Sequence, residues 1–99
     1  MNIIDNIKNN ISSKSITVLG AGISGQGASN LANYLGAKVL LSNNIKTKNI
    51  NIINKNIKIE YPHSDKCLKS DLVIVSPGID VNKSKIINKI DALNIPIIS

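Results

Sequence analysis

Aromatic residues are scarce in this sequence, and arginine is absent. Tyr34 and Tyr61 are the only aromatic residues, and all 12 basic residues are lysine. Proteins recognise the edges of nucleic-acid bases with bidentate arginine contacts, and they stack the bases of single strands on aromatic side chains. A nucleic acid is therefore not a predicted partner, despite the formal net charge of +6. The shortage of rings also means that the core is built from aliphatic residues, of which the abundant isoleucine favours strands.

Cysteine and long apolar runs are equally scarce. The single cysteine, Cys67, excludes an intrachain disulfide and a CxxC metal site, which fits a reduced, cytoplasmic setting. No stretch reaches the roughly 18 apolar residues that cross a membrane, so no membrane partner is predicted. His63 has no cysteine or carboxylate pair at ligand spacing, and we interpret it as a surface loop residue. No catalytic and no metal-ligating residue is predicted.

Short β-branched runs alternate along the chain with stretches whose apolar residues recur three or four positions apart. The runs predict strands and the stretches predict helices. Strands that alternate with helices imply a parallel sheet, so the predicted fold class is α/β, a Rossmann-like open parallel sheet of about five strands with flanking helices. The segment 45–56 is predicted as a loop with a short helix. The expected strands are 16–19, 38–42, 57–61, 71–76 and 95–98, and the expected helices are 3–11, 24–35 and 81–93.

The segment Gly20-Ala21-Gly22-Ile23-Ser24-Gly25 follows the first expected strand and begins the helix 24–35. This is the G-x-G-x-x-G pattern in the setting that it requires. The first glycine permits a tight turn, the second lets the backbone approach a diphosphate, and the third allows close helix–strand packing. Free N–H groups at the helix N-terminus attract phosphate. The loop therefore predicts a site for a nucleotide-linked ligand.

Two other segments end strands at the same edge of the expected sheet. Ser76-Pro77-Gly78 follows the strand 71–76, and Gly78 exposes its backbone amide with no side chain in front. Asp80 or Asn82 is expected to cap the next helix. Dinucleotide-binding domains usually place Asp or Glu after the second strand for the ribose hydroxyls, but this chain has Asn43 and Asn44 there. An amide lacks the charge that strengthens such a bond, which weakens the prediction of an NAD-type ligand.

The segments 18–25 and 71–79 together resemble the N-terminal domain of the Mur ligases, and within them most of all the D-glutamate-adding member. The resemblance runs in register from about Ser15 to Ser99. It implies that residues 1–99 form a single UDP-substrate-binding domain, the N-terminal part of a longer three-domain ligase. The activity of such a ligase belongs to peptidoglycan biosynthesis, and so to cell-wall biogenesis, cell shape and cell division.

The resemblance also implies a ligand and its partners. The expected ligand is the UDP moiety of UDP-N-acetylmuramoyl-L-alanine. The remaining ligase domains, which the 99 residues do not include, are expected to bind ATP and Mg²⁺ and to form the C–N bond. The chain itself is then not catalytic and has no cofactor of its own. The expected UDP-binding residues are Gly22, Ile23, Ser24, Gly25, Asn43, Asn44, Ser76, Pro77 and Gly78.

Two alternatives remain open. The first is an NAD(P)-binding Rossmann domain of a sensor or dehydrogenase, which uses the same glycine loop; Asn43 and the Ser-Pro-Gly loop count against it. The second is a degenerate fragment that folds and binds nothing, for which the drift toward Asn, Lys and Ile between Asn43 and Lys58 is mild support. Displacement of the ligand by UDP or by NADH discriminates the first two, and a flat titration favours the third.

Overall fold

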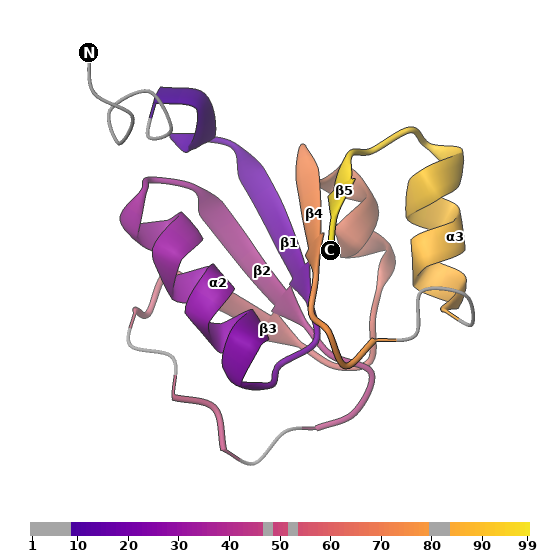
Figure 1. The fold of residues 1–99 in the computed structure, drawn as a ribbon, viewed down its shortest axis with the longest axis horizontal. Coiled ribbons are helices and arrows are strands. Elements are labelled where there is room, and N and C mark those ends of the chain that lie inside the picture. The colour runs from indigo at the N-terminus through magenta and orange to yellow at the C-terminus, as the bar shows by residue number, and fades with distance from the viewer. Residues whose placement is uncertain (1–8, 47–48, 52–53, 80–83) are drawn as a thin grey trace.

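The sheet has five parallel strands in the order β3-β2-β1-β4-β5 (Figure 1). The computed structural model describes residues 9–46, 49–51, 54–79 and 84–99. This arrangement, with helices on both faces, is the Rossmann-like α/β fold that the sequence predicts. The strands are β1 (Ser15–Leu19), β2 (Lys38–Ser42), β3 (Lys58–Glu60), β4 (Leu72–Val75) and β5 (Ile97–Ile98).

The central strands bury side chains on both faces of the sheet. In β1, Ile16 and Val18 belong to the core on one face, whereas Leu19 belongs to the core on the other. In β4, Val73 is fully buried in the second core, and its neighbour Ile74 packs against the first. Parallel strands covered on both sides are apolar at nearly every position. This explains why these two strands stand out so clearly in the sequence.

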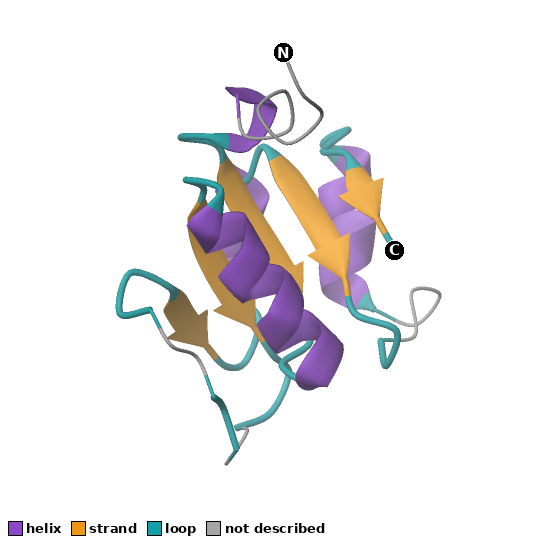
Figure 2. Ribbon diagram, turned by 60° about the vertical axis from the view of Figure 1, so that its left-hand side comes forward, coloured by secondary structure: helices purple, strands orange, loops and turns teal. Residues whose placement is uncertain are grey.

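Helix α2 (Ile23–Tyr34) covers one face of the sheet (Figure 2). It packs through small residues, since its buried positions are Gly25, Ser29 and Ala32. The hydroxyl of Ser29 donates a hydrogen bond to the Gly25 carbonyl oxygen at 2.8 Å, so this buried polar group is satisfied. Small side chains let the helix lie close to β1. The helix ends before Gly36, which has a φ of +97°.

The opposite face is covered by α3 (Lys85–Ala92) and by a short 3-10 helix, η1 (Asp65–Lys69) (Figure 2). Helix α3 buries three isoleucines, and the core that they form with β4 includes Cys67 of η1. Cys67 is fully buried. No helix in the described part of the chain combines the length and apolar character that crossing a membrane requires.

Several elements differ from the sequence-based expectation. Leu93, expected to face inward, is 55% exposed because α3 already ends at Ala92. Helix α3 is capped by Ser84, whose hydroxyl oxygen accepts the N–H of Ile87 at 3.3 Å. Asp80 and Asn82, the expected caps, lie outside the described residues.

The remaining differences concern the connections. No helix occurs in the described residues of the segment 45–56, and the 3-10 helix η1 was not expected. Of the N-terminal helix expected over 3–11, only residues 9–11 are described, and they are helical. Repetitive Ile, Asn and Lys give no clear period in the first case, and η1 is too short for a periodic signal.

Gly25 lies where α2 meets the end of β1, and the packing there leaves no room for a side chain. A Cβ added at Gly25 would lie 1.8 Å from the carbonyl oxygen of Gly20. At Gly27, in the same helix, a Cβ would meet nothing within 4 Å. The two glycines therefore form a matched pair for testing this contact.

We expect Gly25→Ala to lower the free energy of unfolding by about 2 kcal/mol or more, because overpacking a tight contact costs about 1–3 kcal/mol. Gly27→Ala is expected to raise it by up to about 1 kcal/mol, since alanine is the better helix former. Urea unfolding followed by far-UV circular dichroism measures both. Equal unfolding free energies for the two variants would show that the Gly25 contact does not constrain the fold.

Candidate functional site

The glycine loop and the Ser-Pro-Gly loop lie side by side at the carboxyl edge of the sheet. Strands β1 and β4 are neighbours with Leu19 paired to Val75, and each loop follows its strand directly. From β1 the chain proceeds to β2 on one side, while β4 and β5 lie on the other. Ligands of open α/β sheets bind at such a switch point, outside the carboxyl ends of the strands.

Gly20 lies where the two loops pack closely against each other. Its φ is +100°, a left-handed conformation that favours glycine. A Cβ at this position would lie 2.7 Å from the Cβ of Ser76 and 3.3 Å from Cγ1 of Ile79. The first glycine of the motif is therefore required both by its backbone and by the loop that packs on it.

Gly22 is different, because the space in front of it is open. It is the N-cap residue of α2, and its carbonyl oxygen accepts the N–H of Gln26 at 2.9 Å. A Cβ at Gly22 would meet nothing within 4 Å. The first N–H groups of a helix have no acceptor within that helix and carry partial positive charge. An anionic group can thus approach the start of α2 over Gly22.

A pocket of about 330 Å³ opens at this point. Its wall is made by the loops that follow β1, β2 and β4, and the described residues that line it are all uncharged. Gly20, Ala21 and Ile79 contribute to it. So do most of the residues that the sequence predicts for nucleotide binding, namely Gly22, Ile23, Ser24, Asn43, Ser76, Pro77 and Gly78.

Two predicted binding residues lie elsewhere. Gly25 does not line the pocket, since it is buried under the loop against Gly20. Asn44 lines a neighbouring cavity instead. The site that the sequence predicts is therefore brought together in large part, with one member serving helix packing.

Asn43 connects the end of β2 to the glycine loop. Its Oδ1 accepts a hydrogen bond from the backbone N–H of Ala21 at 3.4 Å, and its Nδ2 donates to the carbonyl oxygen of Ile45 at 2.9 Å. Its backbone N–H donates to the carbonyl oxygen of Glu60. The side chain thus lies beside the glycine loop, at the position where dinucleotide-binding domains hold the ribose.

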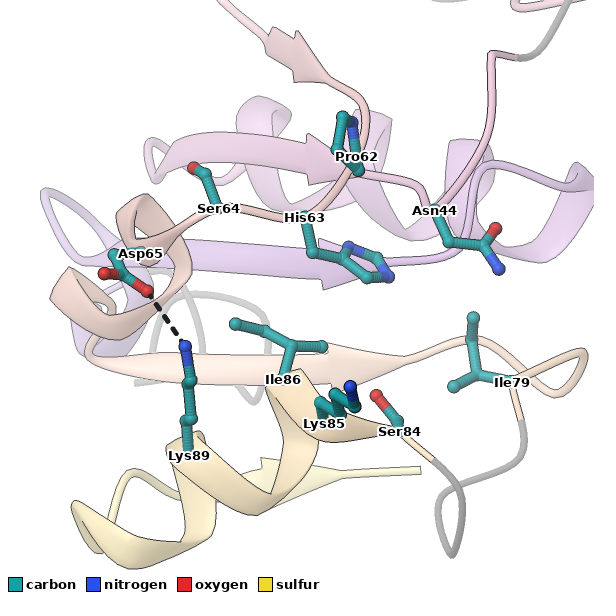
Figure 3. Close-up of a pocket in the computed structure, with 10 residues that line it drawn as sticks. All are labelled: Asn44, Pro62, His63, Ser64, Asp65, Ile79, Ser84, Lys85, Ile86 and Lys89. Atoms are coloured by element: carbon teal, nitrogen blue, oxygen red, sulfur yellow. Dashed lines mark ion pairs between the residues drawn. The ribbon is translucent and has the colours of Figure 1, made fainter.

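The neighbouring cavity has a volume of about 440 Å³ (Figure 3). Its walls come from the end of β2, the loop after β3, the loop after β4 and the start of α3. Ile79 lines both this cavity and the glycine-loop pocket, and the consecutive residues Asn43 and Asn44 line one each. The two hollows are therefore adjacent along the carboxyl edge of the sheet.

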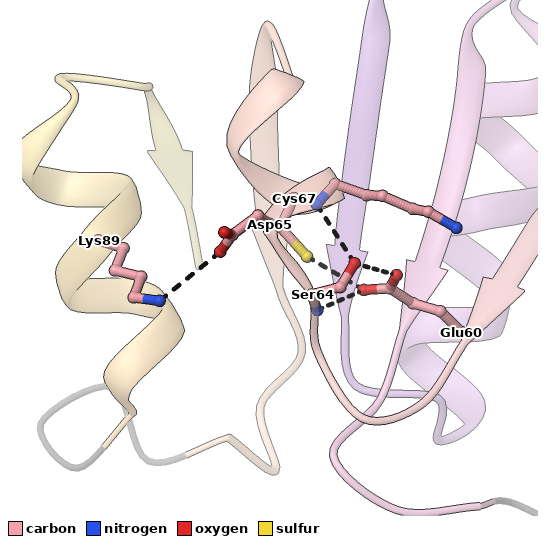
Figure 4. A network of polar contacts seen from close by, with 6 residues as sticks. Glu60, Ser64, Asp65, Cys67 and Lys89 are labelled. Atoms are coloured by element: carbon pink, nitrogen blue, oxygen red, sulfur yellow. Dashed lines mark hydrogen bonds and ion pairs between the residues drawn. The ribbon is translucent and has the colours of Figure 1, made fainter.

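A polar network centred on Glu60 supports this second cavity (Figure 4). The carboxylate accepts hydrogen bonds from the Ser42 hydroxyl at 2.7 Å and from the Ser64 backbone at 2.9 Å, and Cys67 Sγ lies 3.5 Å away. Burial raises the pKa of Glu60, but the hydrogen bonds from Ser64 and Ser42 outweigh it, so the pKa is lower than usual. Burial raises the pKa of the Cys67 thiol.

His63 belongs to the same network. Its Nδ1 lies 2.7 Å from Oγ of Ser42. Burial lowers the pKa of His63, and the negative charge of Glu60, which raises that pKa, only partly offsets the effect. This cluster was not predicted from the sequence, in which His63 was interpreted as a surface loop residue. The available signal was that Ser42 and Glu60 are polar residues ending two adjacent strands.

No protein-family model matches the chain, and no curated protein matches it. Solved structures do. An acyclic imino acid reductase in complex with NADPH and D-Arg is 25% identical with a TM-score of 0.59, over 84% of this chain and 25% of that protein. A D-2-hydroxyisocaproate dehydrogenase is 24% identical with a TM-score of 0.55, over 70% of this chain and 20% of that protein. Shikimate dehydrogenase from Aquifex aeolicus is 20% identical with a TM-score of 0.52, over 96% of this chain and 48% of that protein.

These structures are much longer than this chain, which spans between 20% and 48% of their length. They correct the Mur ligase expectation, because the structural neighbours are dehydrogenases and a reductase rather than ATP-dependent ligases. The predicted UDP-N-acetylmuramoyl-L-alanine ligand was wrong. So were the role in peptidoglycan and cell-wall biosynthesis, cell shape and cell division, the cofactors ATP and Mg²⁺, and the other ligase domains as partners.

The physical reason for the error lies in what the two loops do. Gly20 is required by its left-handed backbone and by the contact with Ser76, and Gly25 by the contact with Gly20. These requirements come from the junction of β1, α2 and β4. They are the same for any phosphate-bearing nucleotide held at a switch point. The loops therefore identify the crevice but do not identify the nucleotide.

The Glu60 network makes stability depend on pH. Because the pKa of Glu60 is lower in the folded than in the unfolded chain, its ionised form stabilises the fold above the unfolded-state pKa. That contribution is lost as pH falls through the folded-state pKa. We expect Glu60→Gln to be less stable than the parent chain at pH 7 and to lose less stability between pH 7 and pH 3. Urea unfolding midpoints across this range measure the difference.

Asp91→Asn, which removes the same charge from an exposed position on α3, is the matched control. It is expected to keep the acid dependence of the parent chain. The account of the network is wrong if Glu60→Gln and Asp91→Asn give the same pH profile.

Proposed function

We propose that this chain is an NAD(P)-binding domain that holds the dinucleotide diphosphate against the glycine loop. The observation that carries the proposal is the open position at Gly22, at the start of α2 and in the wall of a pocket where three loops converge. The similarity to an imino acid reductase that binds NADPH supports this choice of nucleotide.

The lining residues suit the parts of such a ligand. The N–H groups in the first turn of α2 and the hydroxyl of Ser24 would hold the diphosphate, with Gly78 opposite them. Asn43, beside the loop, would face the ribose. When bound, the nicotinamide supplies hydride transfer. The residues of this chain would bind and orient the cofactor through backbone N–H groups and uncharged polar side chains.

The neighbours extend the proposal to a wider activity. We infer that the chain serves an oxidoreductase acting on a small organic substrate, since the matched structures are dehydrogenases and a reductase. The chain spans a fifth to a half of their length, so the substrate and the reaction are part of this proposal. A cytoplasmic setting, predicted from the single cysteine, also remains a proposal.

Gly22→Val tests the diphosphate site directly. The valine side chain would enter the open space without disturbing the core, so the fold is retained while binding of NADPH weakens by at least about tenfold, equivalent to 1.4 kcal/mol. Gly27→Val, at an equally open position of α2 away from the pocket, controls for the effect of valine on the helix. Fluorescence titration with NADPH and with NADH measures both variants.

The titration separates the remaining interpretations. Equal affinity of the parent chain and of Gly22→Val would place the nucleotide elsewhere and contradict the proposal. A flat titration of the parent chain with both nucleotides would favour a fragment that folds and binds nothing.

Asn43→Asp tests the ribose position. A carboxylate there bonds the 2′-hydroxyl of NADH but repels the 2′-phosphate of NADPH, whereas the native amide carries no charge. The aspartate can still accept the N–H of Ala21 through the equivalent oxygen. We expect the substitution to shift the ratio of dissociation constants at least about tenfold toward NADH. An unchanged ratio would show that residue 43 does not face the ribose.

A further inference from the structure

His63 is the single histidine of the chain, and its ring lines the cavity of about 440 Å³. Its two nitrogens have different surroundings. Nδ1 lies 2.7 Å from Oγ of Ser42, which is fully buried at the end of β2. From the loop after β3 the ring extends into the cavity, toward Asn44 and Ile79 (Figure 3). The Nε2 edge is therefore the part of His63 that a molecule in the cavity would meet.

The hydrogen bonds of Ser42 determine which ring nitrogen of His63 carries the proton. The Ser42 hydroxyl donates its one proton to Glu60 Oε2 at 2.7 Å, so its oxygen accepts at the other contact. Nδ1 of His63 must then be the protonated nitrogen. Burial lowers the pKa of His63 and so favours the neutral ring. A neutral imidazole protonated at Nδ1 offers Nε2 as a hydrogen-bond acceptor.

The rest of the cavity suits a flat base. Pro62, Ile79 and Ile86 give it apolar walls, and Ile79 also lines the glycine-loop pocket. The charged residues Asp65, Lys85 and Lys89 line it as well. A nucleotide with its diphosphate over Gly22 can therefore extend along the sheet edge past Asn43 into this cavity. Adenine has apolar faces and an exocyclic amino group that donates hydrogen bonds. A base with a carbonyl group at that position would place an acceptor against an acceptor.

We propose that this cavity binds the adenine base of the dinucleotide and that Nε2 of His63 accepts a hydrogen bond from the adenine amino group. The inference rests on the proposed function, because it assigns a second part of the same ligand. Glu60 and Ser42 act as positioning residues that fix the ring and its proton. His63 is then the residue that selects adenine.

The first test needs no variant. NADPH and its hypoxanthine analogue, which has a carbonyl in place of the amino group, are titrated into the full 99-residue chain. The analogue is expected to bind roughly three- to tenfold more weakly, the range that one hydrogen bond supplies. Equal affinity of the two nucleotides overturns the adenine proposal and leaves the diphosphate proposal standing. Failure of both nucleotides to bind overturns both proposals.

A second measurement observes His63 directly by NMR spectroscopy. As the single histidine it gives one pair of ¹⁵N imidazole signals, expected to report a neutral ring protonated at Nδ1. The Nε2 signal is expected to shift on addition of NADPH. An unchanged Nε2 signal with NADPH bound overturns the proposal, as does a ring protonated at Nε2 in the free chain.

His63→Phe keeps a flat ring but removes the acceptor, so the affinity ratio of the two nucleotides is expected to fall to about one. Lys69→Gln, at an exposed residue of η1 that does not line the cavity, is the control and is expected to keep the ratio. Persistence of the parent ratio in His63→Phe overturns the assignment. If that variant does not fold, the titrations and spectra of the parent chain decide.

Discussion

The close approach of α2 to the ends of β1 and β4 is the constraint on which the site depends. It is possible because Gly25 brings the helix against the Gly20 carbonyl and because Gly20, at a φ of +100°, packs under Ser76. A side chain at either position would separate the helix from the strands. The start of α2 would then no longer lie over the crevice between the two loops, and its N–H groups would not converge with Gly78.

The chemistry of the crevice comes from dipoles rather than charges. Its described lining residues are uncharged, and the attraction for an anion comes from the start of a 12-residue helix and from backbone amides. Charged groups lie further along the sheet edge, where Glu60 holds Ser42 and His63 in place. The carboxyl edge of the sheet thus combines an uncharged glycine loop with a neighbouring cavity in which Ser42 and Glu60 position His63.

Local sequence patterns predict the parts of this molecule that depend on neighbouring residues. The strand Lys38–Ser42 has the predicted bounds, and the glycine loop lies between strand and helix as expected. The cluster of Ser42, Glu60 and His63 was not predicted, because Ser42 lies about 20 residues from the other two and meets them only once β2 and β3 pair. Leu93 was misplaced since the period of α3 does not show where the helix ends.

Two-dimensional amide spectra of the chain, recorded with and without NADPH, test the central claim most directly. If the dinucleotide lies across the switch point, the largest shifts occur at the amides of Gly22, Ser24 and Gly78, with smaller ones at Asn43 and none at the far end of α2. Shifts confined to other surfaces of the sheet, or no shifts at millimolar nucleotide, would contradict the account.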